Sequence, residues 1–252
     1  MRKVPIILLG LAAAVPAGMS AAPDTTVREA SPEAAPAAVV ETAPVQELGV
    51  QPAPGLDLTD PYTLVGPKSL LDDYPAMLAD GSVNAVVEIP TGSVDKWETD
   101  KNDGSLRWEF RDGKPRKVKY LGYPVNYGMV PRTVLAKEHG GDGDPLDVLL
   151  LGASLPRGSV LPVRVVAVMH MVDKGERDDK LVAVRAGTPF DAVHNLQELQ
   201  QLFPGITTIL ETWFSNYKGP GVTETHGFGD VDEARATLEA ASRWFEEKHK
   251  GS

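Results

Sequence analysis

The sequence predicts an α+β domain, because segments typical of β-strands are followed by segments typical of α-helices. The expected strands lie at residues 83–89, 96–99, 106–110, 148–151, 160–171 and 181–184, and the last three are apolar and rich in β-branched residues. The second and third strands face each other across Asp103-Gly104, which predicts a hairpin. Helical spacing of apolar residues predicts helices at 196–203, 206–217 and 231–248. Asp230 is a suitable N-cap for the last helix.

Composition fits one ordinary globular domain with a sizeable core. The chain has 252 residues, of which 42% are hydrophobic and 24% are charged. Its net charge of −10 argues against a nucleic-acid partner, since phosphate backbones require a basic surface. Cysteine is absent, which excludes disulfides and thiolate metal sites.

The N-terminus has the composition of an export signal. A basic start, Met1-Arg2-Lys3, precedes a mostly apolar stretch at 4–15 and then small residues up to Ala22. We therefore expect residues 1–22 to be a secretory signal peptide, too short to span a membrane. The alternative is an uncleaved anchor. Cleavage would leave no stable membrane anchor and would place the protein outside the cytoplasm, in a bacterial periplasm.

Residues 23–60 are rich in Ala, Pro, Glu and Thr and contain few large apolar side chains. Such a composition cannot bury enough apolar surface to fold alone, so we expect a disordered linker. The folded domain is expected at residues 61–252.

The most informative stretch is Asp142-Gly143-Asp144-Pro145-Leu146-Asp147, which leads into the apolar residues 148–151. Three carboxylates this close repel one another, and a hard divalent cation with oxygen ligands is the usual partner that keeps them ionised. The alternative is a polar turn between strands, which Gly and Pro also favour.

Carboxylates in such a cluster suit the hydrolysis of a phosphoanhydride. Two metal ions can lower the pKa of a shared water and hold both the attacking and the leaving oxygen. Oxygen ligands suit Mg²⁺, with Mn²⁺ as a possible substitute, whereas the scarcity of His and the absence of Cys disfavour zinc.

Several further segments accompany the acidic motif in a fixed order. They are Val87-Glu88-Ile89-Pro90, Lys96-Trp97-Glu98, Tyr123-Pro124-Val125-Asn126-Tyr127-Gly128, Asp173-Lys174-Gly175-Glu176-Arg177-Asp178-Asp179-Lys180 and Trp213-Phe214-Ser215-Asn216-Tyr217-Lys218. Together with Asp-Gly-Asp-Pro-Leu-Asp-Val, they resemble the soluble family I inorganic pyrophosphatases from about Val83 to about Lys218. The resemblance implies hydrolysis of inorganic diphosphate to two orthophosphates. It also implies a small, mostly antiparallel barrel of the oligonucleotide-binding (OB) type with helices packed outside, and a homo-oligomer, a hexamer in bacterial members.

The resemblance also implies roles for individual residues. Asp144 would be the catalytic base that accepts the proton of the attacking water. Several Mg²⁺ ions per site would be held by Asp142, Asp147, Asp178, Asp173, Glu88 and Glu98. Within this set, Asp147 would bridge two metals, Asp173 and Asp178 would hold a metal that arrives with substrate, and the two glutamates would act through metal-bound water. The substrate would be bound by Lys96, Arg111, Tyr123, Tyr127, Lys180, Tyr217 and Lys218.

Two of these assignments have alternatives. The family's phosphate-binding arginine is expected at Arg111, with Arg116 as second choice, because the segment before Tyr123 is longer here than in compact bacterial members. Residues 173–180 carry seven charges among eight residues, so they could also be a solvated turn. In either reading we expect Glu176, Arg177 and Asp179 to be ordinary surface charges.

Other classes of function fit less well. A calcium-binding EF-hand counted from Asp142 would need Gly at its sixth position and an acid at its twelfth, where the chain has Asp147 and Ala153. A nucleic-acid-binding barrel is opposed by the net charge. A metal phosphatase that acts on organic phosphates remains an open alternative.

Overall fold

The computed structural model describes residues 51–250. The expected signal peptide at 1–22 and most of the expected linker lie outside the described residues. The strands are β1 Asp57–Asp60, β2 Thr63–Val65, β3 Val83–Ile89, β4 Trp97–Thr99, β5 Leu106–Trp108, β6 Phe110–Arg111, β7 Lys114–Pro115, β8 Asn126–Met129, β9 Asp147–Leu150, β10 Val160–Asp173, β11 Glu176–Arg177, β12 Lys180–Val184 and β13 Thr223–Gly229. The helices are a 3₁₀ turn at Lys137–His139, α1 Leu196–Leu202, α2 Ile206–Asn216 and α3 Val231–Lys250.

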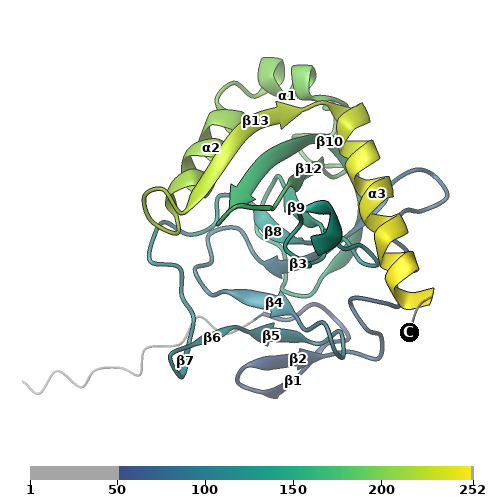
Figure 1. The fold of residues 1–252 in the computed structure, drawn as a ribbon, viewed down its shortest axis with the longest axis vertical. Helices are drawn as coiled ribbons and strands as arrows, with labels where there is room; N and C mark the ends of the chain where they lie inside the picture. Colours follow the sequence, from purple (N-terminus) through teal and green to yellow (C-terminus); the bar gives the residue numbers. More distant parts are fainter. Residues whose placement is uncertain (1–50, 251–252) are drawn as a thin grey trace, which may run out of the picture. The chain divides into compact units, whose positions relative to one another are not determined.

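Five strands close into a ring at the centre of this fold (Figure 1). β10 pairs with β12, β12 with β9, β9 with β8, and β8 with β3, and β3 pairs back onto β10. All of these pairs are antiparallel except β9–β12. The prediction of a mostly antiparallel α+β fold is confirmed, and the finer assignment of the barrel to the OB type stays a prediction.

The helices cover the ring from two sides (Figure 1). Along β12, Val182 and Val184 pack into a cluster shared with α1 and α2, while the alternating Leu181 and Ala183 pack into a cluster shared with α3. The strand is buried on both faces, which is why its sequence is continuously apolar rather than alternating. The expected helices are present, and Asp230 caps α3 by accepting the backbone N–H of Glu233 at 3.2 Å.

The folded unit begins before residue 61, which corrects the expected end of the linker. Ala53 is buried, and its N–H donates to the carbonyl of Arg157 at 2.7 Å. β1 pairs with β2, which continues through β5 to β4 in a second, four-stranded sheet. All four residues of β1 are exposed, so the strand is held by backbone pairing and leaves no apolar pattern to detect.

Two other strands of four or more residues, β8 and β13, also escaped prediction because they are poor in aliphatic residues. β13 follows the helices and is held by β10 at its outer edge. β8 lies inside the ring, where a side chain at Gly128 would collide with the carbonyl oxygen of Val86 on β3. Only glycine permits this close approach of two backbones.

Within residues 51–250, no helix combines the length and the apolar character that crossing a membrane requires.

Candidate active site

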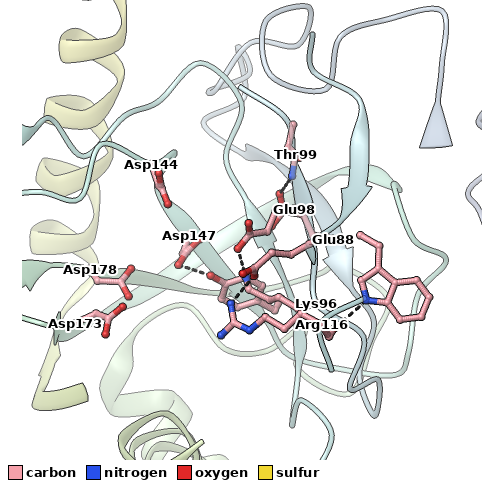
Figure 2. Close-up of polar contacts among 12 residues, drawn as sticks. Glu88, Lys96, Glu98, Thr99, Arg116, Asp144, Asp147, Asp173 and Asp178 are labelled. Atoms are coloured by element: carbon pink, nitrogen blue, oxygen red, sulfur yellow. Dashed lines mark hydrogen bonds and ion pairs between the residues drawn. The ribbon is translucent and has the colours of Figure 1, made fainter. Parts of the chain in front are cut away.

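A cleft of about 900 Å³ opens beside the ring. It is lined by twelve of the predicted residues, namely Glu88, Lys96, Glu98, Arg111, Tyr127, Asp142, Asp144, Asp147, Asp173, Asp178, Tyr217 and Lys218. In Figure 2 the four labelled aspartates lie on one side and face Glu88, Glu98, Lys96 and Arg116 on the other. The fold thus gathers side chains that are up to 130 residues apart in the sequence.

The loop at 142–147 is held in place by hydrogen bonds of its backbone groups. Leu146 is fully buried, and its N–H donates to the hydroxyl of Thr133 at 2.9 Å. The N–H of Leu135 donates to the carbonyl of Asp144 at 2.8 Å. The N–H of Asp144 also donates to the carboxylate of Asp142 at 2.9 Å. This loop carries both aspartates to the cleft at the entrance of β9, as the sequence predicted.

Asp147 and Asp178 are brought together by two neighbouring strands. Asp147 begins β9 and lies in register with Lys180, the first residue of β12. The ammonium of Lys180 lies 2.5 Å from Asp147 and 2.8 Å from Asp178. Tyr127 donates its hydroxyl to Asp147 at 2.6 Å. Lys180 therefore neutralises the charges of both carboxylates, and Tyr127 orients the carboxylate of Asp147.

Lys180 and Tyr123 do not line the cleft. Lys180 is 1% exposed because it is enclosed between the two aspartates that it bridges. Tyr123 packs against Tyr127 and Trp213, and its buried hydroxyl has no partner among the described residues. Their assigned contact with the substrate stays a prediction.

The hairpin at 173–180 is not a solvated turn throughout. Lys218 lies 2.6 Å from Asp173, and Asp178 and Lys180 are buried. Asp179 was expected to be a surface charge, and that expectation is wrong. It is 3% exposed because Arg177, at 2.5 Å, and the N–H of Met171, at 3.2 Å, hold its carboxylate inside the fold.

The opposite wall of the cleft comes from β3 and β4. Glu88 accepts the N–H of Thr99 at 2.7 Å, and burial raises the pKa of Glu88 to about 7. Lys96 lies 2.9 Å from Glu98 and 4.8 Å from the ring centre of Tyr127. The charge of Lys96 holds the pKa of Glu98 below its ordinary value.

One wall of the cleft, which we call the acidic wall, is formed by Asp142, Asp144, Asp147, Asp173 and Asp178. Its electrostatics favour a bound cation. Burial, and then the charges of Asp144, Asp147 and Asp178, raise the pKa of Asp142 to about 7. Burial likewise raises the pKa of Asp178. One carboxylate oxygen of Asp173 is buried without a partner among the described residues. An added divalent cation would relieve all three of these costs.

The same carboxylates do not yet form a closed metal cage. Among residues 51–250, no three acidic or histidine side chains converge closely enough to hold a metal ion. Each of three aspartates forms an ion pair with a lysine instead: Asp147 with Lys180, Asp144 with Lys101, and Asp173 with Lys218. The oxygen-only donors fit Mg²⁺ or Mn²⁺ in chemistry, so the assignment of ligands stays a prediction.

The two candidate arginines differ in position. Arg116 is 16% exposed, forms an ion pair with Glu109 and points toward Lys96 and Glu98 (Figure 2). Arg111 is 61% exposed and lies 3.8 Å from Glu109, nearer the turn of the hairpin β6–β7. The geometry therefore favours Arg116, which the sequence ranked second, because Arg111 lies beside the turn of the hairpin and is mostly exposed.

Among the lining residues that sequence reasoning missed, three contact predicted residues of the site. Lys101 forms an ion pair with Asp144, Thr99 fixes Glu88, and Glu109 pairs with Arg116. Thr99 acts through its backbone N–H, for which residue type carries no signal. Lys101 and Glu109 are ordinary charged residues in sequence, and only the folding of β4 and β5 brings them to the cleft.

The fold and the cleft define a class of protein: an α+β barrel whose charged cleft suits divalent cations together with phosphate groups. Comparison with known proteins identifies the family. The family model for inorganic pyrophosphatase matches residues 85–246, and the chain belongs to this family.

Individual relatives agree with this placement. The chain is 35% identical to the inorganic pyrophosphatase of Haemophilus influenzae over 66% of its own length and 91% of that protein. It is 33% identical to a chloroplastic soluble inorganic pyrophosphatase of Arabidopsis thaliana over 64% of its own length, but it spans only 57% of that relative. The type I inorganic pyrophosphatase of Toxoplasma gondii superposes with a TM-score of 0.67 at 27% identity, covering 73% of this chain and 93% of that one.

Proposed function

We propose that this chain hydrolyses inorganic diphosphate to two orthophosphates with the help of divalent metal ions. The observation that carries the proposal is the division of the cleft into an acidic wall and a facing wall with Lys96 and Arg116 (Figure 2). Divalent ions, when bound, would supply charge neutralisation and a water of lowered pKa. Family membership supports the substrate.

The chain's own groups would then divide the remaining work. Asp142, Asp147, Asp173 and Asp178 would hold the metals, with Glu88 and Glu98 at the edge of the same space. Asp144 would accept the proton of the attacking water. Lys96, Lys218, Tyr127, Tyr217 and Arg116 would orient the phosphate groups by charge-assisted and neutral hydrogen bonds. Lys180 would hold Asp147 and Asp178 in place.

A phosphate-release assay tests the activity. We expect turnover of diphosphate in Mg²⁺, weaker turnover in Mn²⁺, weak turnover of ATP, and none in excess EDTA. p-Nitrophenyl phosphate serves as the control for an organic monophosphatase. Equal turnover of diphosphate and p-nitrophenyl phosphate, or full activity in EDTA, would contradict the proposal.

A pair of variants tests the arginine. We expect Arg116→Ala to raise the KM for diphosphate about tenfold or more, since a charge-assisted hydrogen bond contributes roughly 1.5–3 kcal/mol. Arg111→Ala should change it by less than about threefold, because that side chain is exposed and farther from Lys96. Michaelis constants measured side by side decide the matter, and the reverse order would restore Arg111.

We further propose that residues 1–22 are removed during export and that 23–50 act as a tether. The composition of these segments supports the proposal. N-terminal sequencing of the protein from its native host is expected to start near residue 21 or 23, in the periplasmic fraction. A sequence that starts at Met1 in the cytosolic fraction would refute export and would leave the diphosphatase proposal intact. Assembly into a hexamer stays a prediction from the resemblance, open to sedimentation analysis.

A further inference from the structure

The hairpin β6–β7 forms a wall of the cleft that the proposed reaction does not use. Its turn is Asp112-Gly113, with φ angles of 54° and 71° at these two residues. Two positive φ angles in a two-residue loop are typical of a type I′ turn, which gives a tight and well-defined hairpin. The wall is therefore a built element.

The base of this hairpin is fastened beside Lys96. The carbonyl of Lys96 accepts the N–H of Glu109 at 2.8 Å, and the N–H of Lys96 donates to the carbonyl of Arg116 at 3.0 Å. The residues that flank the hairpin on either side, Glu109 and Arg116, are thus both bonded to the residue that faces the acidic wall. The hairpin leads from the proposed diphosphate site outward.

The two faces of the hairpin differ in chemistry. Phe110 and Pro115 are paired on one face, where Phe110 packs edge-on against Tyr62 with ring centres 4.9 Å apart. Arg111 and Lys114 are paired directly opposite each other. Side chains alternate along a strand, so Arg116 lies on the same face as Lys114. Lys96, Arg116, Lys114 and Arg111, which we name the cation row, follow one another from the diphosphate site to the turn.

The outer half of the cation row is poorly compensated. Like charges directly opposite each other destabilise a hairpin, yet Arg111 faces Lys114. The carboxylate of Glu109 lies 3.8 Å from Arg111 and is already bonded to Arg116. Lys114 has no ion-pair partner within residues 51–250. Both cations line the cleft, where a bound anion would compensate their charges.

We propose that Lys114 and Arg111 form a subsite for a third phosphate group of a linear inorganic polyphosphate. The inference rests on the proposed function, because it places the first two phosphates beside Lys96 and Arg116. A cleft of about 900 Å³ is at the upper end of the sizes that hold drug-sized ligands, so it has room for a longer anion.

An inorganic chain fits the cleft better than a nucleotide does. A nucleobase would need an open aromatic face. The aromatic rings that line the cleft are Tyr127, which is buried, and Tyr217, which stacks on Trp213 with ring centres 4.6 Å apart. The cation row offers charge along its length and no ring on which a base could stack.

Calorimetry with two non-hydrolysable probes tests the subsite in the full chain with Mg²⁺. The probes are imidodiphosphate and imidotriphosphate. We expect Lys114→Ala to weaken imidotriphosphate binding roughly tenfold and Lys114→Glu to weaken it further. Binding of imidodiphosphate should change less than about twofold with Lys114→Ala. Lys68→Ala and Lys68→Glu are the matched controls, since Lys68 is exposed outside the cleft and the change in net charge is the same.

The outcomes separate the possible explanations. Equal losses for both probes, or equal losses in the Lys68 variants, would show general charge attraction and overturn the subsite. No loss for either probe would show that Lys114 is merely solvated and would also overturn it. A wild type that binds neither probe and releases no phosphate from diphosphate would refute the proposed function itself. The melting temperature of Lys114→Ala should be equal to that of the wild type or slightly higher, because the variant removes a like-charge pair.

Discussion

Asp144→Asn is expected to lower kcat for diphosphate by about 10²–10⁴-fold, the usual contribution of a general base. The carboxylate lies at the cleft and is half-exposed, and its one ion-pair partner among the described residues is the exposed Lys101. The substitution keeps the shape of the side chain and removes its capacity to accept a proton. The Mg²⁺ affinity and the thermal stability should change little, since the pair is exposed.

Asp147→Asn is the control that separates the two roles. Asp147 accepts from Tyr127 and Lys180 and stands at the start of β9. Loss of its charge should weaken Mg²⁺ binding and lower kcat together. Mg²⁺ titrations of both variants, followed by calorimetry, provide the measurement. If the two variants gave the same titration, the division into base and metal ligand would be wrong.

Lys180→Met should have the largest effect on stability. Removing the ammonium leaves Asp147 and Asp178 facing each other without their shared cation. Breaking a buried ion pair from one side typically costs about 3–5 kcal/mol, and we expect a loss of this order in the free energy of unfolding at pH 8 in EDTA. Lys101→Met is the matched control, with an expected loss below about 1 kcal/mol, because its pair with Asp144 is exposed.

Two conditions should reduce the loss in Lys180→Met. Burial already raises the pKa of Asp178. The folded state therefore binds protons more tightly than the unfolded state, and stability rises as the pH falls through the raised pKa. Lowering the pH from 8 to 5 should thus recover part of the loss, and Mg²⁺ at pH 8 should do the same as a replacement cation. Urea unfolding under the three conditions is the measurement. A loss equal to that of Lys101→Met would mean that Lys180 does not compensate these carboxylates.

The sequence predicted the parts of the fold whose signal is local. The runs at 148–151 and 181–184 are buried on both faces, and α3 has a cap and an apolar stripe, so each is recognisable from its own residues. β1 and β13 are held by hydrogen bonds to neighbouring strands, and their polar sequences contain no pattern that predicts this pairing. Long-range pairing is the information that a single segment lacks.

The candidate site shows the same limit. The acidic motif stands out because three carboxylates lie within six residues. The burial of Asp179 could not be foreseen, since its partner Arg177 looks like any other surface charge until the hairpin folds back on β10. The choice between Arg111 and Arg116 depended on the strand register of the hairpin β6–β7, which composition does not determine.

The closing of the ring has a consequence for how the chain folds. β3 ends at residue 89, but its second partner, β10, begins at residue 160. A nascent chain that stops short of β10 holds β3, β8 and β9 with two unpaired edges, which can attract other strands. Closure must wait until β10 and β12 have left the ribosome, and it then joins segments far apart in sequence, a topology that slows folding. The arrangement that removes every edge from the finished ring thus leaves those edges exposed until residues 160–184 have been synthesised.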